Sequence, residues 1–202
     1  MPPPQGRRAS NEARKRRAAR RAAVELSEEH GFGAVLMPAI AERAGVSERT
    51  LFRMFGTKAG IFWHDPFLER VATRLDEDTA REDPLRAVLE AVEATARAMD
   101  HEDRDLERRR RALVVAEPEL LGVGARSVMV SGRELTERMT PPDADDAERL
   151  RLTLFAAFAA AALGAVPVDP DEPEEQWVAA LSAAVRVAAF GPLSEPGATS
   201  GR

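Results

Sequence analysis

Cysteine and tyrosine are absent from the 202 residues, and aromatic residues make up only 5% of the chain. Without cysteine there is no disulfide framework and no thiolate metal site, which excludes the zinc-finger classes of protein. The absence of cysteine agrees with a reducing compartment. We therefore expect a cytoplasmic protein.

Long apolar runs are also absent. Residues 152–166 carry no charged side chain, but these fifteen residues are fewer than the roughly 18–20 that a bilayer-spanning helix needs. The amino-terminal sequence MPPPQGRRASNEARKRR is charged and is not followed by the apolar stretch that a secretion signal requires. We expect a buried helix at 152–166, no membrane partner and no export.

Alternating runs of β-branched residues are scarce, whereas alanine, leucine and arginine are abundant. This composition favours helices over strands. No internal repeat of fixed period points to a solenoid. We predict an all-α fold of one or two domains, since a domain usually holds about 100–150 residues.

The formal net charge of −5 hides an uneven distribution along the chain. Residues 1–60 contain twelve Lys or Arg and six Glu, which gives +6. The remaining 142 residues contain seventeen basic and twenty-eight acidic residues, which gives −11. A basic amino-terminal part beside an acidic body is expected when one end of a protein binds a polyanion.

Proline, glycine and N-cap residues divide the amino-terminal part into short elements. Residues 1–11, with three prolines and Gly6, are predicted to form a disordered basic arm. Apolar residues at helical spacing predict a helix over 12–30 that ends at Gly31. Further helices are predicted to start at Pro38, after the N-cap residue Ser47 and, capped by Thr57, at Lys58.

Prolines and acidic turns divide the rest of the chain into longer helices. The fourth helix is expected to break or kink at Pro66, and later helices are predicted over 84–99, 103–117, 120–139, 144–165 and 173–190. We assign residues 12–57 to one domain and 58–191 to a larger helical domain. Residues 192–202 are predicted to be a flexible tail.

The segment that joins the second and third helices has the residues that two crossing helices require. Close approach needs a small side chain on the first helix, a glycine able to take positive φ at the turn, and an apolar side chain on the second helix. Ala41, Gly45 and Leu51 occur in this order. The pattern predicts an amino-terminal three-helix DNA-binding domain with a helix-turn-helix over about residues 37–54. Other interior positions are Ile40, Ala44, Val46 and Phe55.

With Leu51 facing inward, helical periodicity turns other side chains of the third helix toward solvent. Arginine can bind guanine bidentately, and threonine or phenylalanine can touch the thymine methyl group. Phe52 fits either a DNA contact or a cover over the edge of the core. Residues predicted to contact bases are Arg49, Thr50 and Arg53, and those predicted to contact phosphates are Ser47 and Lys58.

A basic run precedes this reading unit. Such a run is most often a solvated face, but its position favours phosphate or minor-groove contacts. Its eight positive residues, interrupted by the single acid Glu12, are Arg7, Arg8, Arg14, Lys15, Arg16, Arg17, Arg20 and Arg21.

Residues 22–63 resemble the amino-terminal domain of the TetR family of bacterial transcriptional regulators. The residues that carry the resemblance are Ile-Ala-Glu-Arg-Ala-Gly-Val-Ser at 40–47, Thr-Leu-Phe-Arg at 50–53, Phe55 and Lys58. The family often has threonine before its second helix, where this chain has Val35 and Leu36, and tyrosine or histidine where it has Met54. These departures concern two usual backbone contacts with DNA.

The resemblance implies a homodimer, a small-molecule effector bound in the carboxy-terminal domain, and a repressor released from a palindromic double-stranded DNA operator when the effector binds. It places the dimer contact on the last two helices, here the Ala- and Leu-rich residues 150–163 and 177–187. The effector is expected to be small and apolar, and no cofactor is expected.

Two alternatives stay open. A DNA-binding dimer could be controlled by a partner protein that docks on the carboxy-terminal body. An enzyme is disfavoured, because the sequence has no glycine-rich phosphate loop or nucleophile motif. We expect no catalytic and no metal-binding residue, since the three histidines, His30, His64 and His101, lack the spacing of helical metal ligands.

Overall fold

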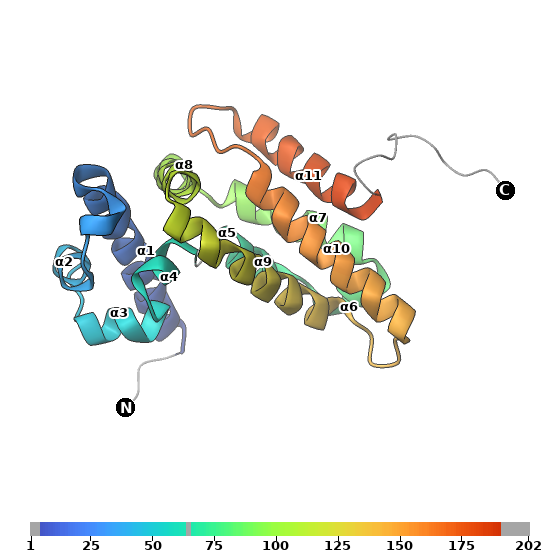
Figure 1. Cartoon of the computed structure of the whole chain (residues 1–202). Coiled ribbons are helices and arrows are strands. Elements are labelled where there is room, and N and C mark those ends of the chain that lie inside the picture. Colours follow the sequence, from blue (N-terminus) through green and yellow to red (C-terminus); the bar gives the residue numbers. More distant parts are fainter. Residues whose placement is uncertain (1–4, 64–65, 191–202) are drawn as a thin grey trace. The chain divides into compact units, whose positions relative to one another are not determined.

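The computed structural model describes residues 5–63 and 66–190, and every regular element in these ranges is a helix (Figure 1). The predicted all-α class is therefore confirmed. The described residues divide into two compact units. The first unit comprises residues 5–63 and 106–125, and the second comprises residues 66–105 and 126–190.

The first unit begins with a long helix followed by four short ones. These elements are α1 (Gln5–His30), the 3₁₀ turn η1 (Phe32–Ala34), α2 (Met37–Arg43), α3 (Glu48–Phe55) and α4 (Lys58–Trp63). Their core consists of small residues on α1, such as Ala19 and Ala23, and larger ones on the short elements, such as Phe32 and Leu51. Phe32 meets Phe62 edge-on, with ring centroids 5.4 Å apart.

The prediction of an arm over residues 1–11 is wrong for residues 5–11, which extend α1 by seven residues ahead of the predicted start. The prolines lie ahead of the helix, and Gly6 alone costs about 1 kcal/mol relative to alanine. Local side-chain pairs also favour the helix: Arg16 binds Glu12 at 3.2 Å and Arg14 donates to Asn11 at 2.9 Å. Residues 1–4 of the predicted arm, and the predicted tail over 192–202, lie outside the described residues.

Seven further helices complete the described chain. They are α5 (Pro66–Arg74), α6 (Glu77–Glu82), α7 (Pro84–Arg97), α8 (His101–Ala116), α9 (Pro118–Met139), α10 (Asp146–Ala165) and α11 (Glu174–Phe190). The sequence reading missed α6, which is short and begins at the N-cap Asp76, whose carboxylate accepts a bond from the Thr79 N–H at 2.9 Å. Apart from the start of α1, the predicted helix boundaries agree with the structure to within a few residues.

The second unit has one continuous apolar core. Helix α11 packs closely along both α7 and α10, and α5 and α6 pack on α7. Ala156 and Ala160 on α10 allow close contact, and Trp177 and Leu181 on α11 are buried in the same cluster. Gly132 on α9 lies so close to α10 that a Cβ there would be 3.2 Å from the Cα of Ala157.

The predicted domain boundary after residue 57 is wrong in two respects. Helix α4 belongs to the first unit, because Ile61 and Phe62 are buried in its core. The same core contains Leu106, Val114 and Leu120 from α8 and the start of α9. A boundary drawn along the sequence could not show this, because these residues reach the first unit from more than 40 positions downstream.

Within the ranges 5–63 and 66–190, no helix has the length and apolarity that crossing a membrane would demand.

Candidate DNA-binding site

The turn between α2 and α3 has the predicted geometry. Gly45 takes φ +65°, in the region that L side chains rarely adopt. Ala41 is 4% exposed and Leu51 is fully buried, and both side chains belong to the core of the first unit. The Val46 N–H donates to the Ala41 carbonyl at 3.0 Å, which closes the turn onto α2.

Ser47 begins α3 as an N-cap. Its backbone is extended (φ −75°, ψ 149°), and its hydroxyl oxygen accepts the Thr50 N–H at 3.2 Å. The hydroxyl groups of Ser47 and Thr50 lie 2.8 Å apart and are hydrogen-bonded to each other. The structure therefore brings these two predicted contact residues together at the positive end of the helix dipole.

Three of the predicted contact residues on α3, namely Arg49, Phe52 and Arg53, are exposed to solvent. Thr50 is half-buried. Phe52 has 47% of its surface exposed, so its ring does not close the core as one of the two sequence readings allowed. One face of an eight-residue helix thus presents two guanidinium groups and an aromatic ring.

Lys58 is placed differently from the other predicted contact residues. Its ammonium donates to the carbonyl of Phe32 at 2.7 Å and to that of Val35 at 3.1 Å. The Nζ atom also lies 4.0 Å from the centroid of the Phe32 ring, a cation–π geometry. The side chain therefore joins the amino end of α4 to η1, a structural role that the sequence reading missed.

The departures from the usual TetR pattern have local consequences. Leu36 occupies the N-cap of α2 without a side-chain hydrogen bond and is 66% exposed. Val35 is buried, and Met54 is partly buried against the core of the first unit. Neither Val35 nor Leu36 offers the hydroxyl that a threonine would place before α2.

An ion pair outside the predicted site fixes α2 on α1. The Arg43 Nη1 lies 2.6 Å from a carboxylate oxygen of Glu29, and this hydrogen bond lowers the pKa of Glu29 and raises that of Arg43. Both side chains are exposed, so the pair adds little to the stability of the unit.

Helix α1 meets the end of α3 through its basic residues. The guanidinium carbons of Arg16 and Arg20 lie 5.7 Å and 5.9 Å from the centroid of the Phe55 ring. Figure 1 shows the amino-terminal end of α1 on the same side of the first unit as α3. Positive charge on α1 therefore lies beside Phe55, at the carboxyl end of α3.

The described residues contain no group of three or more His, Cys, Asp or Glu side chains arranged to hold a metal ion.

Comparison with known proteins agrees with this geometry. Residues 20–63 match the family described as bacterial regulatory proteins, tetR family. A region of 103 residues is 33% identical to a Mycobacterium tuberculosis protein named MftR, for a transcriptional regulator of mycofactocin biosynthesis, and covers 48% of this chain and 50% of that protein. The match thus spans half the length of the relative.

Two solved structures are similar over most of the chain. A TetR-family regulator from Streptomyces coelicolor A3 aligns with 86% of this chain and 96% of its own, at 21% identity and a TM-score of 0.41. The repressor FadR from Thermus thermophilus, solved with lauroyl-CoA, aligns with 93% of this chain and 100% of its own, at 17% identity and a TM-score of 0.45.

Proposed function

We propose that this chain, whose residues 20–63 match the family described as bacterial regulatory proteins, tetR family, is a cytoplasmic, sequence-specific DNA-binding transcriptional regulator. It acts as a homodimeric repressor on a palindromic operator, and a small apolar effector releases it. Its activity is binding and not catalysis. The observation that carries the proposal is the Gly45 turn, which presents Arg49 and Arg53 on the solvent face of α3.

In the proposed complex α3 lies in the major groove. Arg49 and Arg53 bind base edges, Phe52 touches a thymine methyl group, and Thr50 contributes its methyl group while its hydroxyl stays on Ser47. The free N–H groups at the start of α3, next to Ser47, face a phosphate. Lys58 retains a third hydrogen for a phosphate beyond its two bonds to η1.

Selection of bound fragments from the source genome tests the proposal. We expect a palindromic sequence whose half-sites lie about 10 base pairs apart, or a multiple of that spacing, because two copies of α3 must enter successive major grooves. Recovery of fragments with no shared sequence would contradict specific reading.

The extended α1 offers a second surface for DNA. Positions 7, 14 and 21 are seven residues apart, close to two helical turns, so they follow one face of the helix. Arg14, Arg17 and Arg21 lie on the side opposite the buried Ala19 and Ala23. A helix with this stripe of charge fits a phosphate backbone, and over residues 5–11 it takes the place of the predicted disordered arm.

Replacing Arg14, Arg17 and Arg21 together with glutamine is expected to weaken binding to cognate and random DNA alike. The slope of log K against log salt is negative, and it should become less steep by about 0.9 for each phosphate that the protein no longer neutralises. The matched control replaces the exposed Arg86, Arg97 and Arg133 of the second unit and should leave the slope unchanged. Equal slopes for both triple variants would show that the α1 charge is only solvated.

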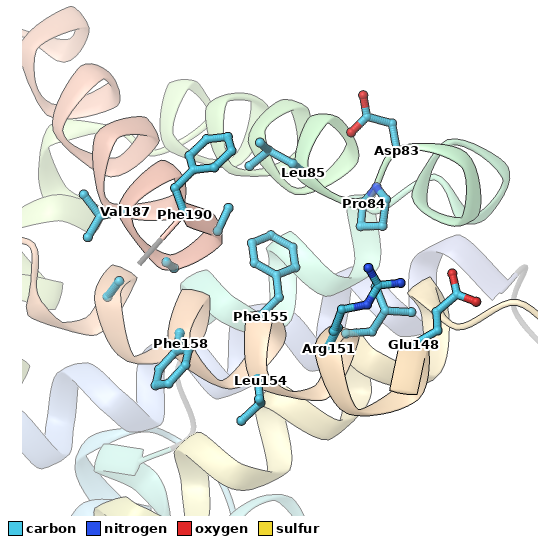
Figure 2. Close-up of a pocket in the computed structure, with 14 residues that line it drawn as sticks. Asp83, Pro84, Leu85, Glu148, Arg151, Leu154, Phe155, Phe158, Val187 and Phe190 are labelled. Atoms are coloured by element: carbon cyan, nitrogen blue, oxygen red, sulfur yellow. The ribbon is translucent and has the colours of Figure 1, made fainter. Parts of the chain in front are cut away.

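An apolar groove on the second unit is proposed as the dimer contact. Its volume is about 860 Å³, and α7, α10 and α11 line it. Figure 2 shows Phe155, Phe158 and Phe190 around the groove, with Asp83, Glu148 and Arg151 at one end. Contiguous exposed apolar surface of this kind marks an interaction site. The exposed apolar residues on α10 and α11 are Leu150, Leu154, Phe158, Val187 and Phe190.

These residues refine the predicted dimer surface. Trp177, Leu181 and Val185, which fall within the segment 177–187 predicted for the dimer contact, are buried within the second unit. A self-complementary contact through Leu154 and Phe158 across a two-fold axis would cover what remains exposed.

Phe158→Asp is expected to convert the dimer to a monomer, because it places a charge in the centre of the apolar contact. Sedimentation at micromolar concentration would measure the change, and operator affinity should fall with it, since a single reading helix remains per molecule. Val115→Asp, at a residue 72% exposed on α8, is the control and should stay dimeric. A dimeric Phe158→Asp variant would place the interface elsewhere.

The effector is proposed to bind among the helices of the second unit, because ligand sites in helical proteins commonly lie between bundle helices. Thermal-shift screening with small apolar metabolites, followed by operator release, tests this point. If no metabolite releases the DNA and a cellular protein does, the partner-controlled alternative holds.

A further inference from the structure

A buried ionic cluster lies in the first unit, away from the proposed DNA contacts. Glu107 and Arg110 on α8 are 3% and 4% exposed. Arg110 donates to both carboxylate oxygens of Glu107, through Nε at 2.8 Å and Nη2 at 2.6 Å. Arg111 donates to the same carboxylate at 2.6 Å. The cluster therefore satisfies a fully buried carboxylate with two guanidinium groups.

The cluster is firmly charged. Burial alone would raise the pKa of Glu107, but the charges and hydrogen bonds of Arg110 and then Arg111 outweigh it and lower that pKa to about 2. Replacing such a buried ion pair with apolar residues of similar size is often neutral or stabilising, so stability alone does not explain its presence. Unlike apolar contacts, hydrogen bonds from charged groups fix the orientation of the groups that they join.

The helix whose orientation the cluster fixes is α4. The remaining donor of Arg110, Nη1, binds the carbonyl of Phe62 at the carboxyl end of that helix. The neighbouring Trp63 donates its indole N–H to the Leu120 carbonyl at the start of α9. At the other end of α4, Lys58 is bound to the carbonyls of Phe32 and Val35. A helix of six residues is thus held at both ends by directed hydrogen bonds.

Helix α4 is in turn closely joined to α3. Only Gly56 and Thr57 separate them, and the Gly60 N–H donates to the Thr57 hydroxyl at 3.0 Å. Gly60 packs directly on the Phe55 carbonyl, so that a Cβ at this position would be 2.1 Å from that oxygen. With so little space between them, α3 and α4 move together, and the orientation of α4 sets that of the arginines on α3.

We propose that Arg110 is a positioning residue for DNA reading, which holds α4, and through it α3, at the angle that the major groove requires. The inference rests on the proposed function, since it specifies how the same reading helix is oriented. Arg110 acts through the Phe62 carbonyl and does not itself contact DNA. The fork of the guanidinium matters, because it must bind Glu107 with two nitrogens and the Phe62 carbonyl with the third.

The test compares variants of the full chain on its selected operator and on random DNA. The double substitution Glu107→Leu with Arg110→Met keeps the volume and removes both fully buried charges. Arg111, whose side chain is 16% exposed, can then turn to solvent, so the melting temperature should stay within a few degrees. Operator affinity should fall at least tenfold while affinity for random DNA, which depends on charge at the surface, changes less than twofold. Arg110→Lys, which keeps the charge but loses the fork, should show most of the same loss.

Arg111→Met is the matched control. This substitution removes one positive charge from beside the Glu107 carboxylate, as Arg110→Met would. It leaves the bond between Arg110 and Phe62 in place, so operator affinity should remain within twofold. A folded double variant with unchanged operator affinity would overturn the proposal, and so would an equal loss on operator and random DNA. Failure of the wild-type protein to prefer any sequence would contradict the proposed function instead.

Discussion

Replacing Gly60 with alanine is expected to destabilise the first unit by about 3 kcal/mol, at the upper end of the usual cost of overpacking. The new Cβ would lie 2.1 Å from the Phe55 carbonyl oxygen and 3.2 Å from its carbon. Because the obstacle is backbone and not a flexible side chain, relief requires α4 to move away from α3. Thermal unfolding followed by circular dichroism should show a loss of more than about 10 °C.

Gly33→Ala is the matched control for this substitution. Gly33 lies in η1 of the same unit, and a Cβ there would have nothing within 4 Å. Its melting temperature should stay within about 2 °C of the wild type, since surface substitutions usually change stability by less than about 0.5 kcal/mol. If both variants melt together, the close approach of α3 and α4 is not the reason for glycine at position 60.

The helix-turn-helix could be predicted from the sequence because its requirements are local. A positive φ at Gly45, an N-cap at Ser47 and a buried Leu51 each depend on residues within a few positions. Their spacing alone then turns Arg49 and Arg53 outward. The alternation of proline breaks and apolar periodicity likewise predicted most of the later helices.

The parts that sequence reasoning missed depend on contacts between distant segments. Lys58 has the charge expected of a phosphate contact, but the carbonyls that bind it lie 23 and 26 positions earlier. Arg110 stands in a run of four arginines, where only its helical register with Leu106 and Val114 marks it as facing the core. Gly60 is a weaker indication of its own role. Glycine inside a helix costs about 1 kcal/mol relative to alanine, so its presence there suggests that another group lies too close for a side chain.

Arg53→Ala is expected to lower operator affinity by about 1–3 kcal/mol for each half-site, and to relax the base preference at the position that Arg53 reads. The side chain is exposed on α3, so truncating it leaves the buried core of the unit intact. Affinity for random DNA should fall far less. Binding measured on the selected operator, on single-base variants of it and on random DNA would separate these effects.

Arg53→Lys distinguishes base reading from phosphate binding at this position. Lysine keeps the positive charge but lacks the planar fork that donates to two acceptors of one guanine. If Arg53 reads a base, the lysine variant should lose specificity nearly as fully as the alanine variant. If Arg53 binds phosphate, lysine should restore most of the affinity, and the alanine variant should weaken cognate and random DNA equally. That second outcome would leave Arg49 as the main arginine reader on the exposed face of α3.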